Sequence, residues 1–109
     1  MPYDPQLAKR LKEILGGGQG FQEKKMFGGI GWMLNGNMCV GVYKEWLIIR
    51  VGVEAAAKIF KEAHVKPMDI TGKPMKGWAM VAPAGVVKST ELKRYTELAA
   101  VFVKTLPKK

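Results

Sequence analysis

Basic residues gathered around one tryptophan are the feature of the sequence that most suggests chemistry. Trp78 lies between a glycine- and proline-containing stretch with lysines and a later stretch with further lysines and an arginine. Lysine and arginine bind phosphates, so a basic loop and the basic start of a helix can follow a nucleic-acid backbone. We predict nucleic-acid contact at five basic residues: Lys73, Lys76, Lys88, Lys93 and Arg94.

Two observations limit that prediction. Trp78 stands in an apolar run typical of a core strand, and the sequence has no helix-turn-helix, zinc-finger or RNA-recognition motif. Positive charge also has a simpler explanation, because net charge keeps a small protein soluble. Nucleic-acid contact and solubility alone both stay open as explanations.

The residues that usually perform nucleophilic catalysis or bind metals are scarce. The sequence contains one cysteine, Cys39, one histidine, His64, and one serine, Ser89. A structural zinc site needs four ligands, and a serine nucleophile needs a partner base in a recognisable motif, so neither is predicted. We expect Cys39 to be a buried thiol, His64 to be structural at a helix end, and Ser89 to be a helix N-cap.

Two glycine-rich stretches are similar to phosphate-binding loops but stand in the wrong context. Residues 16–20 follow a predicted helix and precede a strand, whereas a dinucleotide-binding loop follows a strand and opens a helix. Residues 28–31 lack the lysine and the serine or threonine of a P-loop. We predict close backbone packing or a bulge at 28–31 instead.

Carboxylates offer no acid–base pair either. Glu23, Glu45 and Asp69 stand in turn-like or polar surroundings, where a solvated side chain is the usual state. The sequence therefore predicts no catalytic residue, no cofactor and no metal.

The stretch from Met26 to Val51 must organise the fold that positions these residues. Apolar residues alternate with smaller ones on both sides of Asn35-Gly36, the dipeptide that suits a type I′ hairpin turn. The run from Trp46 to Val51 follows the polar pair Lys44-Glu45, which predicts a second tight turn. Phe21 to Lys25 precedes them as a short edge strand. We therefore predict an antiparallel meander of four strands.

Three amphipathic helices and two more strands complete the prediction. Asp4 is the expected N-cap of the first helix, and the glycines at 16–18 are expected to end it. The helices are expected at Pro5–Leu15, Glu54–Ala63 and Ser89–Thr105, and the strands at Pro67–Ile70 and Trp78–Val81. We predict one α+β domain over residues 1–109, in the order α-β-β-β-β-α-β-β-α, with the helices packed on the sheet.

Length and charge narrow the class of protein. A chain of 109 residues with 48% hydrophobic residues is one folded domain. The net charge is +9, and residues 66–109 hold nine basic against three acidic residues, which favours polyanions or acidic partners. No apolar run approaches the ~20 residues that span a bilayer. With one cysteine and no signal peptide, we expect a soluble cytoplasmic protein without membrane contact.

The order of several short motifs resembles the N-terminal domain of the TfoX/Sxy family of bacterial competence regulators. Met26-Phe27-Gly28-Gly29 opens the meander, the Asn35-Gly36 turn follows, and Gly72-Lys73-Pro74-Met75 comes later, before Trp78 and Pro83. The first and third motifs are fairly specific together, although each alone is weak. The similarity extends over nearly the whole chain.

The resemblance implies an α+β domain with a meandering sheet in a bacterial, cytoplasmic protein. It also implies transcriptional co-activation beside an activator of the cyclic-AMP receptor type, and it supplies no catalytic residues. Family regulators carry a C-terminal helical domain, whereas this sequence ends at Lys109, so a stand-alone N-terminal domain is expected.

The predicted function is that of a non-enzymatic regulatory module. It would contact a protein partner, such as the transcription machinery, with weak nucleic-acid contact as an addition. The alternative is a dimerisation or interaction module that has no nucleic-acid role, in which the same chain forms a homodimer or binds another protein.

Overall fold

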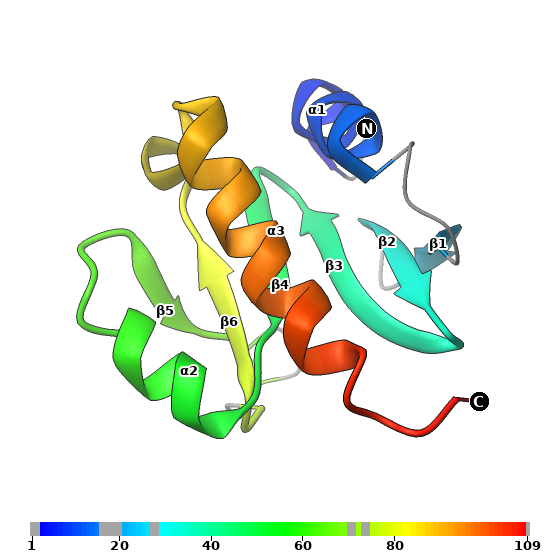
Figure 1. Cartoon of the computed structure of the whole chain (residues 1–109). Helices are drawn as coiled ribbons and strands as arrows, with labels where there is room; N and C mark the ends of the chain where they lie inside the picture. The colour runs from blue at the N-terminus through cyan, green and yellow to red at the C-terminus, as the bar shows by residue number, and fades with distance from the viewer. Residues whose placement is uncertain (1–2, 16–20, 27–28, 70–71, 73–74, 109) are drawn as a thin grey trace.

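The computed structural model describes residues 3–15, 21–26, 29–69, 72 and 75–108. These residues form three α-helices, one short 3₁₀ helix and six strands (Figure 1). The helices are α1 (Pro5–Leu15), α2 (Val53–Ile59), η1 (Pro83–Val86) and α3 (Ser89–Val103). The strands are β1 (Phe21–Met26), β2 (Gly29–Leu34), β3 (Asn37–Tyr43), β4 (Trp46–Arg50), β5 (Val65–Pro67) and β6 (Trp78–Val81).

All six strands join one antiparallel sheet in the order β1-β2-β3-β4-β6-β5. The first four strands form the predicted meander, with β1 at one edge. After α2 the chain returns to the other edge as β5, and β6 then fills the place between β5 and β4. The predicted α+β class and element order are confirmed, with η1 added before α3.

The turn between β2 and β3 has the predicted geometry. Asn35 and Gly36 both have positive φ angles, of 55° and 81°, as a type I′ turn requires. Close packing is also confirmed at Gly29, because a Cβ atom there would collide with the carbonyl oxygen of Val42 on the neighbouring strand. Gly28 lies outside the described residues.

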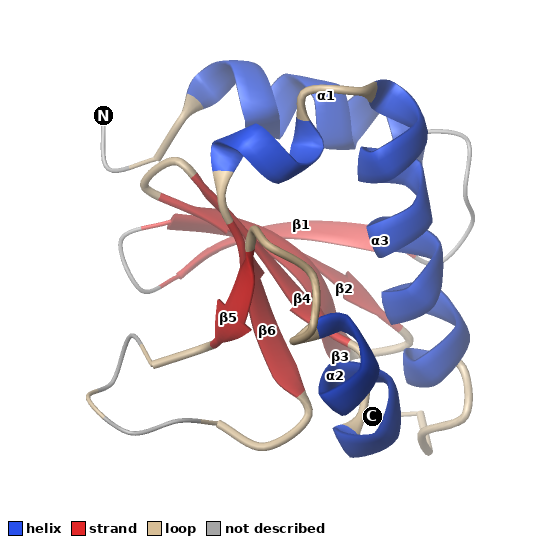
Figure 2. Cartoon of the chain, turned by 90° about the vertical axis from the view of Figure 1, so that its left-hand side faces the viewer, coloured by secondary structure: helices blue, strands red, loops and turns tan. Residues whose placement is uncertain are grey.

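The three α-helices cover one face of the sheet, as Figure 2 shows. The carboxylate of Asp4 accepts the backbone N–H groups of Gln6 and Leu7, at 2.9 and 3.4 Å, which confirms the predicted cap of α1. The glycines at 16–18 lie outside the described residues. Arg10 of α1 donates to the carbonyl oxygen of Val86 at 2.7 Å and so ties α1 to η1.

The core between helices and sheet is apolar and closely packed. Leu11, Val40, Leu47, Ile49 and Leu92 are fully or almost fully buried there. They come from α1, β3, β4 and α3, so each element depends on the others for burial of its apolar side.

The opposite face of the sheet, which we call the open face, carries a second and smaller cluster. Ile48, Met68 and Met80 are buried there, and Trp46 and Trp78 pack against them while partly exposed. The expectation that Trp78 lies in the core is therefore corrected. Its strand is paired on both sides, but its side chain alternates with Ala79 and faces away from the helices.

Several predicted boundaries are wrong by a few residues. Helix α2 ends at Ile59 rather than near Ala63, and β5 spans Val65–Pro67 rather than Pro67–Ile70, whose last residue lies outside the described chain. The reason is tertiary, because Val65 must face Val81 and the core, so the chain leaves the helix early enough to reach the sheet edge.

The third helix also differs at both ends. The N-cap position belongs to Lys88 rather than to Ser89, which is the first helical residue, and no side-chain cap hydrogen bond forms there. The helix ends at Val103 rather than at Thr105. η1 comes just before α3 in the chain and packs against it. This contact sets where α3 starts.

Gly52 gives a direct test of how the start of α2 packs against α3. Its φ and ψ are 87° and 160°, a region reserved for glycine, and a Cβ would lie 2.7 Å from two ring carbons of Phe102. We expect Gly52→Ala to lower the free energy of unfolding by about 2 kcal/mol or more, from backbone strain and displacement of the ring. Urea denaturation followed by circular dichroism measures it.

Gly72 is the matched control. Its φ is 89°, yet a Cβ there would have no atom of the described residues within 4 Å. Gly72→Ala should therefore lower the free energy of unfolding by only about 1 kcal/mol, from backbone strain alone. Equal losses at the two glycines would contradict close packing of Gly52 against Phe102.

Candidate functional site

The structure does not bring the predicted basic residues into one cluster. Lys73 lies outside the described residues. Lys76 comes just before β6, whereas Lys88 and Lys93 come after its far end, at the start of α3. All three described lysines are exposed.

The two groups also belong to opposite sides of the sheet. α3 packs on β3 and β4 from the helical face. Met75 and Trp78, on either side of Lys76, pack on the open face. A single nucleic-acid strand or duplex therefore has no continuous surface through these residues, and nucleic-acid contact at them stays a prediction.

Arg94, the fifth predicted residue, is held by two carboxylates. Its Nη2 atom lies 2.6 Å from Glu62 Oε1 and 2.6 Å from Glu91 Oε2. Its Nη1 atom also donates to Glu62 at 3.2 Å, and the Tyr95 hydroxyl donates to the same glutamate at 2.5 Å. Two carboxylates against one guanidinium leave this cluster with a net negative charge, which disfavours a phosphate.

The cluster shifts the ionisation of its members in consistent directions. The hydrogen bond from Arg94 lowers the pKa of Glu62, and the two glutamates raise the pKa of Arg94. Burial, followed by the bond to the carboxylate of Glu62, raises the pKa of Tyr95 to about 12. The arrangement links the segment after α2 to α3 and is structural.

The lowered pKa of Glu62 predicts how stability depends on pH. The pKa of Glu62 is below its ordinary value of 4.5 in the folded chain. The ion pair therefore stabilises the fold fully above about pH 4.5, and this stabilisation is lost as the pH falls through the folded pKa. Since the ion pair is partly exposed, we expect Glu62→Gln to lower the free energy of unfolding by only about 1 kcal/mol near neutral pH.

Denaturant unfolding at several pH values checks this. The difference between Glu62→Gln and the native chain should shrink toward zero in acid. Glu97→Gln, at an exposed glutamate of α3, is the control and should have little effect at any pH. A difference for Glu62→Gln that stays constant into acid would contradict the ion-pair account.

Cys39 is a core residue, as expected. Its side chain is 0% exposed, and burial raises the pKa of the thiol to about 12. A thiol that stays protonated is a poor nucleophile and a poor metal ligand. Among the residues that the structure describes, no group of three His, Cys, Asp or Glu could hold a metal ion.

The protected thiol is easily tested. We expect the native chain to react very slowly with iodoacetamide at mildly alkaline pH, and to react readily once unfolded in urea. Mass spectrometry of the modified protein measures both rates. Fast alkylation of the native chain would mean that Cys39 is accessible.

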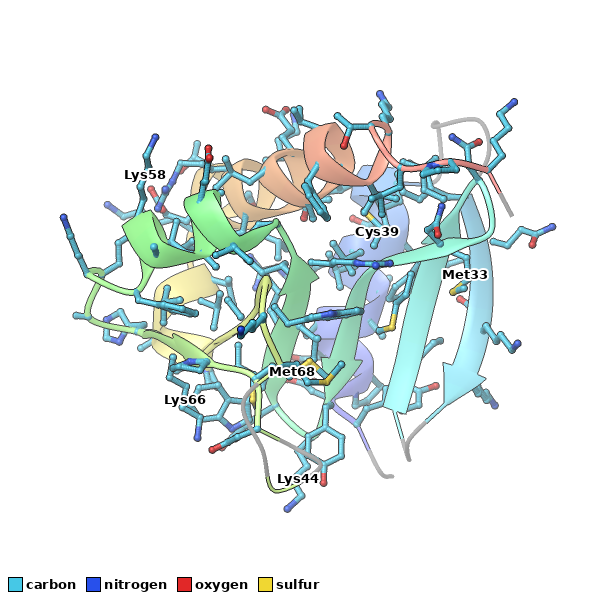
Figure 3. The ribbon with its side chains drawn as sticks, turned by 90° about the horizontal axis from the view of Figure 1, so that it is seen from below. Met33, Cys39, Lys44, Lys58, Lys66 and Met68 are labelled. Carbon is cyan, nitrogen blue, oxygen red and sulfur yellow. The ribbon has the colours of Figure 1, made fainter. Side chains whose placement is uncertain are left out.

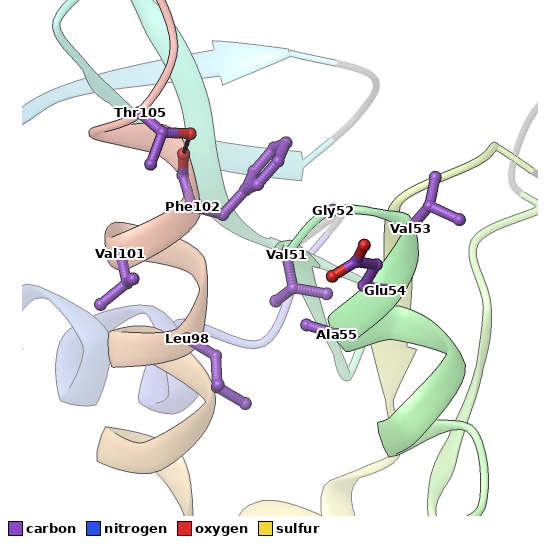
Figure 4. A pocket seen from close by; sticks show the side chains of 9 residues that line it. All are labelled: Val51, Gly52, Val53, Glu54, Ala55, Leu98, Val101, Phe102 and Thr105. Atoms are coloured by element: carbon purple, nitrogen blue, oxygen red, sulfur yellow. Dashed lines mark hydrogen bonds between the residues drawn. The ribbon is translucent and has the colours of Figure 1, made fainter.

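The described residues form a groove of about 380 Å³ between the start of α2 and the end of α3 (Figure 4). It is mostly apolar, and Glu54 is its one charged lining residue. The lining residues are Val51, Gly52, Val53, Glu54, Ala55, Leu98, Val101, Phe102 and Thr105.

Two valines make the groove unusual for a surface. Val53 and Val101 are 63% and 66% exposed at the two rims with their side chains directed outward, and Leu98 and Phe102 lie partly exposed between them (Figure 4). The helical spacing of Leu98 and Phe102 is typical of a buried face, so the sequence does not indicate this site. The available signal was an additional apolar residue, Val101, outside that face.

Comparison with known proteins decides the family. Residues 13–102 match the model of the TfoX N-terminal domain. The chain belongs to the TfoX N-terminal domain family. The match extends from the last turn of α1 to Phe102 near the end of α3, so it covers the sheet, the open face and every residue of the groove except Thr105.

Other comparisons add no further relative. No curated protein and no solved structure matches the sequence significantly. TfoX N-terminal domains are a family of regulators and are not a known enzyme family. Within the described residues, no helix of this TfoX domain is long and apolar enough to cross a membrane.

Proposed function

We propose that this TfoX domain is a non-enzymatic regulatory module of bacterial transcription in the cytoplasm that binds a protein partner through the groove between α2 and α3. The regulatory role rests on the family. The binding role rests on one observation, an apolar groove that contains partly exposed Leu98 and Phe102 and has the exposed Val53 and Val101 at its rims (Figure 4).

The groove suits a protein segment better than a small molecule. Small-molecule sites enclose their ligand and place several polar groups around it, whereas this groove is open and offers mainly apolar side chains. Two helix walls with an apolar floor are the usual seat for the apolar side of a third helix. We therefore propose an amphipathic helix of the partner as the occupant.

Burial of the valines supplies part of the binding energy. Full burial of one valine side chain contributes about 1.5 kcal/mol or more, which corresponds to about tenfold in affinity. Val101→Glu should therefore weaken partner binding at least about tenfold. Because Val101 is exposed, the same change should alter stability by less than about 0.5 kcal/mol.

Site-specific photo-cross-linking in bacterial cells tests the proposal. A benzoylphenylalanine at position 101 should form an adduct with a second protein, which mass spectrometry identifies. The same probe at position 87 is the control, because Val87 is 73% exposed but stands before α3, far along the helix from the groove. Equal adducts from both positions would contradict a site at the groove.

The identity of the adduct separates the two functions that the sequence left open. An activator or a subunit of the transcription machinery supports the regulatory module. An adduct of the domain with itself supports the alternative, a homodimer formed through the same apolar walls. No adduct from position 101 would contradict both.

A further inference from the structure

The open face of the sheet carries positive charge at both edges. One row of paired residues crosses all six strands and consists of Lys24, Gly31, Gly41, Ile48, Met80 and Lys66. The four inner residues are buried, with the end of the Met38 side chain against the two glycines, whereas the lysines at the ends of the row are exposed. Figure 3 shows Lys44, Lys66 and Met68 on the side of the sheet away from α3.

Three partly exposed aromatic rings flank this row, each with a cation beside it. Tyr43 and Trp46 are paired across β3 and β4, and Trp78 is paired with Arg50 across β4 and β6. Lys66 Nζ lies 4.8 Å from the Trp46 ring centre, and the Arg50 guanidinium lies 5.3 Å from that of Trp78.

The charge around these rings is predominantly positive. The basic residues on or beside the open face are Lys24, Lys44, Arg50, Lys66 and Lys76. Among the described residues of the same segments, the acidic ones are Glu23, Glu45 and Asp69. Glu23 is paired with Trp32, which belongs to the core on the helical side, and Asp69 lies 3.9 Å from Lys66. An anionic ligand therefore complements this face.

We propose that the open face binds single-stranded nucleic acid. Bases stack on the rings of Trp46 and Trp78, and the phosphates between them contact Lys66 and Arg50. Aromatic side chains on a sheet surface next to basic ones are the combination that single strands require, because unpaired bases present both a flat ring and a negative backbone. This site is separate from the groove of the proposed function.

The cations beside the rings are compatible with stacking. An exposed cation–π contact is weaker than the stack of a base on an aromatic ring. An arriving base can therefore displace the flexible Lys66 side chain from Trp46, and the ammonium group then lies next to the phosphate of the same nucleotide.

Other anionic partners fit less of this face. A duplex keeps its bases stacked on each other, so it would contact the lysines and leave the rings unused. An acidic peptide would likewise satisfy the cations but not the two tryptophans. The geometry thus favours a ligand with unpaired bases.

Fluorescence titration with an oligothymidylate of about ten nucleotides, a length that a small binding face covers, tests the proposal. We expect tryptophan quenching at low salt and steep release as salt rises. Trp46→Ala should weaken binding about tenfold or more, as loss of one stack predicts. Lys66→Glu should also weaken it several-fold.

Two control variants separate stacking from general attraction. Phe60→Ala removes a partly exposed aromatic residue just after α2, and Lys9→Glu reverses an exposed charge on α1. Both should bind like the native chain. Circular dichroism shows whether each variant folds. If Trp46→Ala does not fold, the comparison of Lys66→Glu with Lys9→Glu still tests the proposal.

Several results would overturn the proposal. They are absence of binding at low salt, equal binding of a duplex or of a polyglutamate peptide of matched charge, and equal weakening by Lys66→Glu and Lys9→Glu. None of these results affects the cross-linking at the groove, which tests the proposed function independently.

Discussion

The two-residue turn at Asn35 and Gly36 determines which side of the sheet every residue of β2 and β3 faces. Because strand side chains alternate, a slip of one residue would exchange the two faces. With the observed register, Val40 and Val42 face the helices, whereas Gly41 and Tyr43 face the other way. The helical layer, the core and the open face all depend on this register.

The helices cover only one of the two faces. All three α-helices bury their apolar sides on one face, which leaves the aromatic and basic residues of β4 and β6 without helical cover on the other. A sheet covered on one side only normally shows polar residues on the second side. Here that side contains Trp46, Trp78 and a small buried cluster, a pattern that solubility does not require.

The groove has a different origin. It forms because α2 begins directly after β4, at Gly52, and because the Phe102 ring lies close against that glycine. α3 thereby meets α2 through its Leu98 and Phe102 side, and Val101 is left at the rim. The exposed apolar surface is thus a consequence of how two helices converge rather than of either helix alone.

The α+β class, the type I′ turn, the cap at Asp4 and the buried Cys39 could all be predicted from the sequence, because each depends on local conformational preference or on a periodic pattern. Three features could not be predicted: the ion pair of Arg94 with Glu62, the positions of Lys76 and Lys88 at opposite ends of β6, and the outward direction of Trp78. These depend on contacts between residues far apart in the chain, which sequence spacing does not encode.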